Sequence, residues 1–142
     1  MPSYNDITNR LEAAALAVHT SNPVSGLTAT TGQSGSTRSL PSVVFYAEQG
    51  EEFPQGSGNY KMQLTCRVES SADQTTLATH RGYFAAIADM FTDSAIAATL
   101  SSSLSDFHAI GANNPRLRHT VEDRANVSEL TLEVYCCAVE LV

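Results

Sequence analysis

The side chains of this sequence that could support catalysis or metal binding are four histidines, three cysteines and the acidic pair Glu51-Glu52, which falls in a predicted loop. His19 is expected at the end of a helix, where a cation interacts favourably with the last carbonyl groups. His80 falls on the apolar stripe of a second predicted helix, which favours a half-buried, hydrogen-bonded residue over a ligand. His108 and His119 lie on predicted strands without the clustered ligands typical of a metal site. The sequence therefore predicts no metal ion and no other cofactor.

Nucleophilic chemistry has equally little support. Each cysteine falls in an alternating apolar strand pattern, which predicts buried and unreactive thiols. Cys136 and Cys137 are adjacent, and neighbours on a strand point to opposite faces, so reduced thiols are expected rather than a disulfide. No serine lies in a Gly-x-Ser-x-Gly turn. Glu51-Glu52 falls in a predicted turn, where an acidic pair is usually solvated. The sequence therefore predicts a protein that is not an enzyme.

One basic cluster stands out in an acidic chain. Arg116, Arg118 and Arg124 lie together with His119, next to acids at positions 122 and 123. Mixed signs at this density predict salt bridges, either within a sheet or across a subunit boundary. A phosphate-binding role is the alternative.

Composition limits the choice of partners. The 142 residues suit one domain, with 15 acids, 8 Lys and Arg residues and a net charge of −7. This charge argues against tight DNA or RNA binding, but it leaves room for a conduit through which DNA slides. Only 16% of residues are charged, so much of the surface could be buried against neighbours. No apolar run approaches the roughly 20 residues of a membrane span, and the polar N-terminus does not resemble a secretion signal.

Hydrophobic periodicity predicts two main helices, Tyr4 to His19 and Asp73 to Phe91, the second with a capping box formed by Ser71 and Gln74. The Ala-rich stretch from Asp93 to Ser103 predicts a further short helix. Between the two main helices, residues 21–41 are rich in Ser, Thr and Gly and predict a flexible loop.

Strand patterns fill the rest of the chain. Residues 42–48 and 60–69 predict a long hairpin joined by a turn-rich connection, residues 49–58. Residues 107–112 and 116–123 predict two strands separated by Asn113-Asn114-Pro115, and residues 127–139 predict the last strand. These elements predict an α+β fold, a mostly antiparallel sheet of about four strands with the two main helices packed on one face. The other, polar face is left for solvent or partners.

The order of these elements resembles a known family. Residues 60–75, the amphipathic helix that follows and the closing strand Leu-Thr-Leu-Glu-Val-Tyr-Cys-Cys at 130–137 resemble the tail terminator (tail completion) proteins of tailed bacteriophages. In that family an N-terminal helix precedes a β-hairpin, a second helix and C-terminal strands. The likeness spans nearly the whole chain, but the family has no catalytic signature.

The resemblance implies a structural virion protein, a homo-oligomer that forms a hexameric ring. The ring would cap the tail tube protein in the neck and join it to a head–neck adaptor, while genomic DNA passes through its lumen without specific binding. Another neck component, such as a head-completion adaptor, and a tail-tube subunit are alternatives, and a small enzyme or ligand-binding domain is a rival class. His80, His119 and Glu51-Glu52 would have to converge in space to support that rival.

The hairpin connection, residues 49–58, is expected to contact a neighbouring subunit or the tube end. Its base is held by two paired strands, and Phe53 beside Pro54 is an apolar anchor in a polar turn, as at many interface hot spots. The alternative is that Phe53 folds back onto the domain's own core. The candidate interface residues are therefore Glu51, Glu52, Phe53, Arg116, Arg118 and Arg124.

Overall fold

The computed structural model describes residues 4–32, 40–52, 59–104, 107–122 and 124–138, except for the side chains at positions 4–6, 48, 49, 51, 52 and 138. The elements in chain order are α1 (Tyr4–Ser21), β1 (Thr28–Thr31), β2 (Ser42–Glu52), β3 (Tyr60–Ser71), α2 (Leu77–Phe91), α3 (Ile96–Ser103), β4 (Phe107–Glu122) and β5 (Ala125–Ala138). No helix among the described residues is long and apolar enough to cross a bilayer.

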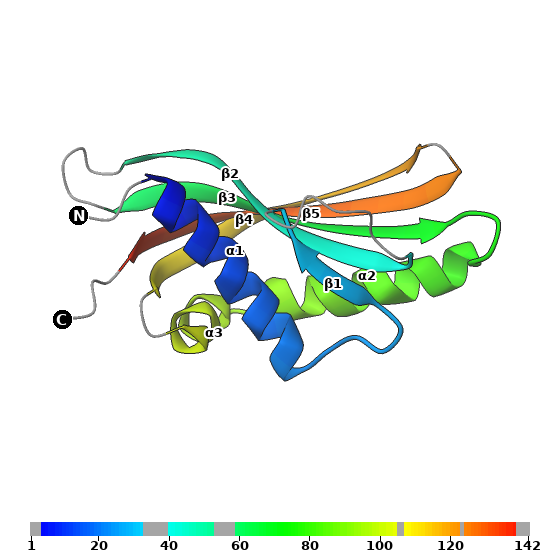
Figure 1. The fold of residues 1–142 in the computed structure, drawn as a ribbon, viewed down its shortest axis with the longest axis horizontal. Helices are drawn as coiled ribbons and strands as arrows, with labels where there is room; N and C mark the ends of the chain where they lie inside the picture. Colours follow the sequence, from blue (N-terminus) through cyan, green and yellow to red (C-terminus); the bar gives the residue numbers. More distant parts are fainter. Residues whose placement is uncertain (1–3, 33–39, 53–58, 105–106, 123, 139–142) are drawn as a thin grey trace.

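The strands form one sheet in the order β1-β2-β3-β5-β4, and the three helices lie on one side of it (Figure 1). β1 runs parallel to β2, whereas every other neighbouring pair is antiparallel. The predicted α+β class and the β2–β3 hairpin are confirmed. The sheet has five strands instead of about four, and the short helix predicted within Asp93 to Ser103 is α3, which joins the two main helices in the layer.

The core lies between the sheet and the helices. On β3 and β5 the alternating apolar residues are buried, as their patterns predicted: Met62, Leu64, Cys66, Val68, Leu130, Leu132, Val134 and Cys136. The stripe on α1 is confirmed at Ile7, Leu11, Ala14 and Val18. On α2 the prediction holds for His80, Ile87 and Phe91, but Leu77 is 40% exposed because it begins the helix at the margin of the sheet.

The loop predicted for residues 21–41 contains a strand. Residues 28–31 form β1, whose outer edge is only four residues long. β1 stops at Gly32, whose N–H donates to the Phe45 carbonyl. The next outward N–H of β2, that of Ala47, donates to Oε2 of the buried Glu12 on α1 at 2.9 Å. The Glu12 carboxylate therefore accepts the hydrogen bond that a longer β1 would otherwise accept from β2.

The helix α2 begins four residues later than predicted. Ser71, the expected cap, belongs to β3 and pairs with Ala125 of β5. The cap is Thr76, whose side-chain oxygen accepts from the Thr79 N–H at 3.1 Å. Ser71 is paired in the sheet, the Ala72 N–H donates to the Arg124 carbonyl, and the Thr75 N–H donates to the Ser71 carbonyl. The helix therefore starts only after this turn.

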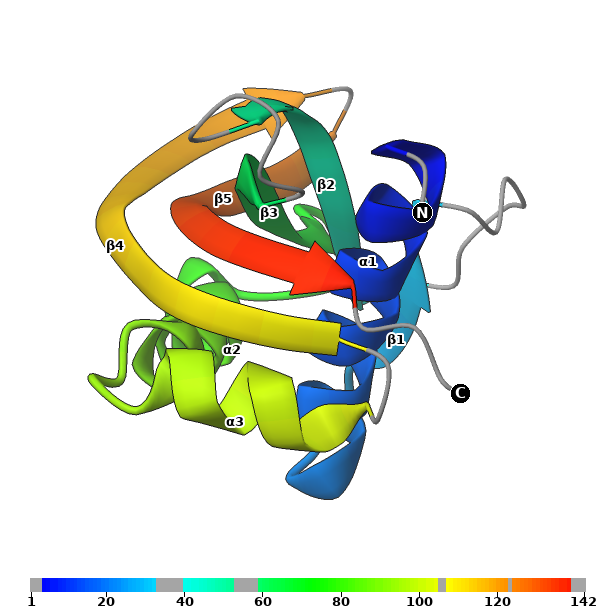
Figure 2. The ribbon, with the colours of Figure 1, turned by 90° about the vertical axis from the view of Figure 1, so that its left-hand side faces the viewer.

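The two strands predicted around Asn113-Asn114-Pro115 are one long strand. β4 follows β5 from Phe107 to Glu122, with register shifts after Ala109 and after Asn113. Asn114 has a φ of 54°, so residues 114 and 115 form a bulge instead of a break. Bulges bend a strand, and Figure 2 shows β4 curving strongly along its course.

The predicted connection at residues 49–58 is shorter than expected. β2 continues to Glu52, with a register shift between Glu48 and Glu51. Glu51 and Glu52 are therefore strand residues opposite Lys61 and Tyr60, not turn residues. Gly50 lies in the irregular step, where any side chain would collide with the carbonyl oxygen of Lys61.

Candidate functional site

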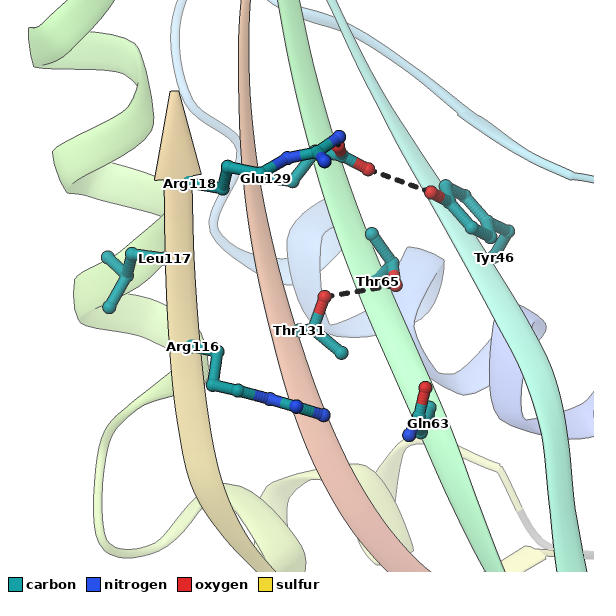
Figure 3. Close-up of a pocket in the computed structure, with 8 residues that line it drawn as sticks. All are labelled: Tyr46, Gln63, Thr65, Arg116, Leu117, Arg118, Glu129 and Thr131. Atoms are coloured by element: carbon teal, nitrogen blue, oxygen red, sulfur yellow. Dashed lines mark hydrogen bonds and ion pairs between the residues drawn. The ribbon is translucent and has the colours of Figure 1, made fainter. Parts of the chain in front are cut away.

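The face of the sheet opposite the helices carries a polar patch built from four strands. We call it the central patch, and the side chains that form it are Tyr46, Gln63, Thr65, Arg116, Arg118, Glu129 and Thr131. They line an open hollow of about 350 Å³ (Figure 3). Strand alternation explains the gathering, because Tyr46, Thr65 and Thr131 are register partners on adjacent strands.

Glu129 is the hub of the central patch. It is only 9% exposed, and its two carboxylate oxygens accept from the Tyr46 hydroxyl at 2.9 Å and from the Arg118 guanidinium. Burial alone would raise the pKa of the Glu129 carboxyl. The hydrogen bonds from Tyr46 and Arg118, with the charges of Arg118 and Arg67, outweigh burial and lower the pKa below its ordinary value. Glu129 is thus a fixed negative charge that ties β4 and β2 to β5.

A second ionic group extends the patch toward the β4–β5 turn. Arg67 on β3 donates to Glu69 at 2.6 Å and to Glu122 of β4 at 2.8 Å. Burial would lower the pKa of Arg67, but its hydrogen bonds to these carboxylates raise it. The salt bridges predicted around the basic cluster therefore exist within the sheet, at Arg118 and Glu122.

The other two arginines of the predicted cluster have a different role. Arg116 is exposed and reaches across β5 toward the middle of the patch, whereas Leu117 points away from it (Figure 3). Arg124 lies in the β4–β5 turn with a φ of 65°. Neither guanidinium has a carboxylate partner in the described part of the chain. Both residues are exposed.

The predicted interface residues are spread along the sheet: Glu51 and Glu52 lie at one end, Arg116 and Arg118 lie in the middle, and Arg124 lies in the turn at the other end. Glu51 pairs with Lys61 at one end, whereas Ser71 pairs with Ala125 at the other. Ten residues of β3 separate the two ends, roughly 33 Å at strand spacing. The structure therefore does not bring Glu51 and Glu52 to the arginines, and Phe53 lies outside the described residues.

Sequence reasoning missed a polar cluster buried on the other side of the sheet. Nδ1 of His80 lies 2.7 Å from Oγ of Ser70, and its Nε2 lies 2.9 Å from Oγ of Ser128. Nδ1 of His119 lies 2.9 Å from the same Ser128 oxygen, and the two rings are 5.6 Å apart. His80 and His119 thus do converge, without Glu51 and Glu52. The contacts of Ser70 and Ser128 with His80 could not be predicted from local sequence patterns, because the two serines lie 10 and 48 residues from His80.

The Ser–His cluster has hydrogen-bond distances compatible with an activated nucleophile, but it lacks the other parts of such a site. Ser128 is 3% exposed and lies in β5 with a paired strand on each side, opposite Val68 and His119. Its neighbouring N–H groups serve the sheet ladder, so they do not form an oxyanion hole. Burial, and next the charge of His119, lowers the pKa of His80. A neutral ring that bonds two serines ties α2 to β3 and β5, a structural role.

Burial also determines the state of His19 and of two cysteines, whereas His108 is exposed. His19 lies in the last turn of α1, as predicted, but the prediction that it is a cation there was wrong, because its buried Nε2 accepts from the Val24 N–H at 3.1 Å and burial lowers its pKa. Cys66 and Cys136 are buried as predicted, and burial raises both thiol pKa values, that of Cys136 to about 12. The same prediction was wrong for Cys137, which is only half-buried because it points to the opposite face of β5 from Cys136. In the described ranges, no three His, Cys, Asp or Glu residues are grouped to hold a metal ion.

Comparison of the sequence with models of known protein families and with curated proteins finds no match. The fold and the central patch define an α+β domain with an ordered ionic surface on one side of its sheet. The geometry of the chain and the order of its elements are therefore the basis for assigning a function.

Proposed function

We propose that this chain is a structural subunit of the neck of a tailed bacteriophage, a tail-terminator-like protein that assembles as a hexameric ring on the end of the tail tube. The observation that carries the proposal is the order of the elements. An N-terminal helix α1, the hairpin β2–β3, the helix α2 and the C-terminal pair β4–β5 follow the order that the sequence resemblance implies.

The exposed apolar residues support a role in assembly. Five large hydrophobic side chains are exposed in the described part of the chain, and three of them lie on the edge strand β4. Ile110, Leu117 and Val121 are 56%, 58% and 65% exposed. Ser101 of α3 bonds the N–H and the carbonyl of Ala109 on β4. Beyond Ala109 this edge strand exposes apolar side chains, a kind of surface that soluble proteins normally protect. Burial against neighbouring subunits would provide that protection.

The electrostatics suit a ring around a passage for DNA. The net charge of −7 disfavours lasting contact with phosphates, so DNA would move through the lumen without being held. The tail tube protein and a head–neck adaptor would be the partners on the two faces of the ring, and the protein would be found in the virion neck. A head-completion adaptor or a tail-tube subunit would share these properties, and their different effects on tube length separate them.

The rival function is a small hydrolase built on Ser128 and His80. The hydrogen bonds of the Ser–His cluster favour this function, but the burial of Ser128 between two paired strands opposes it. Incubation with a fluorophosphonate probe distinguishes the two. A structural protein remains unlabelled, whereas a stoichiometric adduct on Ser128 would establish a nucleophile.

Assembly is tested with the purified protein and with tail tubes polymerised in vitro. Sedimentation velocity over a concentration series and negative-stain imaging should reveal a closed ring, and added protein should bind at tube ends and stop elongation. A tube-forming protein would instead lengthen the tubes, and a head-side adaptor would leave them unchanged. A strict monomer that leaves tube length unaltered would refute the proposal.

A further inference from the structure

The last part of β4 overhangs the helical layer. Leu117 and Val121 point to the helix side of the sheet, because Leu117 is the register partner of the buried Leu130, yet both remain more than half exposed. The paired ends of β4 and β5 rise away from α2 in Figure 1. Between them lies a hollow of about 330 Å³ that Arg81, Leu117 and other residues line. We call Leu77, Arg81, Leu117 and Val121 the overhang surface.

A second hollow of about 500 Å³ lies where the three helices meet. Val18, Ala86 and Met90 supply apolar walls, and the exposed Asp89 and Asp93 lie on its rim. No basic residue lines it. We call it the helix groove. It is acidic and apolar, whereas the overhang surface is basic and apolar.

The unpaired charges match these two surfaces. Within the described ranges, Arg81 of the overhang surface has no carboxylate partner, and neither Asp89 nor Asp93 of the helix groove has a basic one. Asp89 also lies in the last turn of α2, where the helix dipole disfavours a negative charge. Nothing within the described subunit compensates Asp89, so a positive charge supplied from outside would.

We propose, on the basis of the assembly role above, that the overhang surface of one copy docks in the helix groove of the next copy. Arg81 faces Asp89 and Asp93 of that neighbour, while Leu117 and Val121 cover its apolar walls. The two surfaces differ, so the contact is head-to-tail. Such a contact repeats from copy to copy and closes into a ring when the rotation allows.

Charge reversal on each side tests this pairing. Arg81→Glu makes the overhang surface acidic. Asp89→Arg/Asp93→Ser makes the groove basic, and the serine hydroxyl keeps an oxygen for the Ala95 N–H that Asp93 now binds. Each variant alone should self-associate about 100-fold or more weakly than wild type, because like charges then meet across the contact. An equimolar mixture should assemble again, because each altered surface then meets an oppositely charged one.

Thermal melting controls for misfolding. Asp89→Arg removes an unfavourable charge from the C-terminal turn of α2, so the isolated subunit should melt no lower than wild type. Loss of assembly in a well-folded variant, with recovery in the mixture, supports the proposal.

Three results would overturn it. Wild-type assembly by both variants would reject these surfaces while the proposed function stands. Normal rings that no longer dock on tail tubes would assign the surfaces to the tube protein instead of a second copy. A wild-type protein that never self-associates, even at low salt, would reject both the pairing and the proposed ring.

Discussion

His80 gives the most direct test of how α2 is held on the sheet. Its ring is fully buried and bonds Ser70 and Ser128. His80→Ala would leave a cavity and would deprive the buried Ser70 hydroxyl of its partner, whereas Ser128 would keep His119. A cavity of this kind and one unsatisfied hydroxyl together cost about 3–5 kcal/mol. The free energy of unfolding, measured with urea at a mildly alkaline pH, should fall by that amount.

His119→Ala is the matched control. His119 bonds the same Ser128 oxygen from the exposed side of the cluster, so its loss leaves Ser128 with His80. A surface change of this kind should alter the free energy of unfolding by about 0.5 kcal/mol or less. Equal effects of the two substitutions, or a loss below about 1 kcal/mol for His80→Ala, would show that the cluster does not anchor the helix.

The same residue predicts how stability depends on pH. Burial, and next the charge of His119, lowers the pKa of His80, and burial lowers that of His19. At a pH below the ordinary histidine pKa of about 6.5, the unfolded chain therefore binds more protons than the folded chain does. Stability is complete above this pH and falls as the pH drops toward the folded-state values. His80→Asn, neutral at every pH, should make the decline between about pH 7.5 and 5.5 shallower, and an unchanged slope would contradict the argument.

Three further predictions concern local backbone and thiol chemistry. Gly82 lies in an open position on α2, so Gly82→Ala should raise the free energy of unfolding by about 0.5–1 kcal/mol. Gly50→Ala should lower the free energy of unfolding, because the new methyl group meets the backbone of β3. Equal effects of the two substitutions would contradict this backbone geometry. Thr76→Ala should cost about 1 kcal/mol in urea unfolding through loss of the helix cap, and no loss would mean that another group caps α2. In the folded protein a thiol reagent should modify the half-buried Cys137 and leave Cys66 unmodified until urea is added, and rapid modification of Cys66 would refute its burial.

Sequence patterns predicted the central strands well because burial there follows strand alternation. β3 and β5 lie between paired strands and show one apolar face each, so period two is visible in the residues themselves. The stripe on α1 was visible for the corresponding reason, with a helical period. Elements at the margin gave weaker signals. β1 consists of Thr-Ala-Thr-Thr, which has no apolar face and joins the sheet only because β2 offers an unpaired edge.

The continuity of β4 could not be predicted from Asn113-Asn114-Pro115, which normally ends a strand. Pro115 is tolerated because β4 is an edge strand and the bulge removes the need for its missing N–H group. The predicted salt bridges of the basic cluster were correct in kind, but their partners Arg67 and Glu129 come from other strands. Such long-range partners depend on the register of the sheet, which local patterns do not specify.

The two edges of the sheet are protected unequally. One edge is formed by β1, which is four residues long. Beyond β1, the next outward N–H group of the sheet is that of Ala47 on β2, and it donates to Glu12 of α1. The other edge is the sixteen-residue β4. Growth of a cross-β fibril needs two free edges on every molecule, one to add to and one to be added to. Because the sheet has one long edge at most, edge-to-edge strand pairing between copies stops at two chains. The chain can therefore carry the long edge strand β4 and still resist fibril formation.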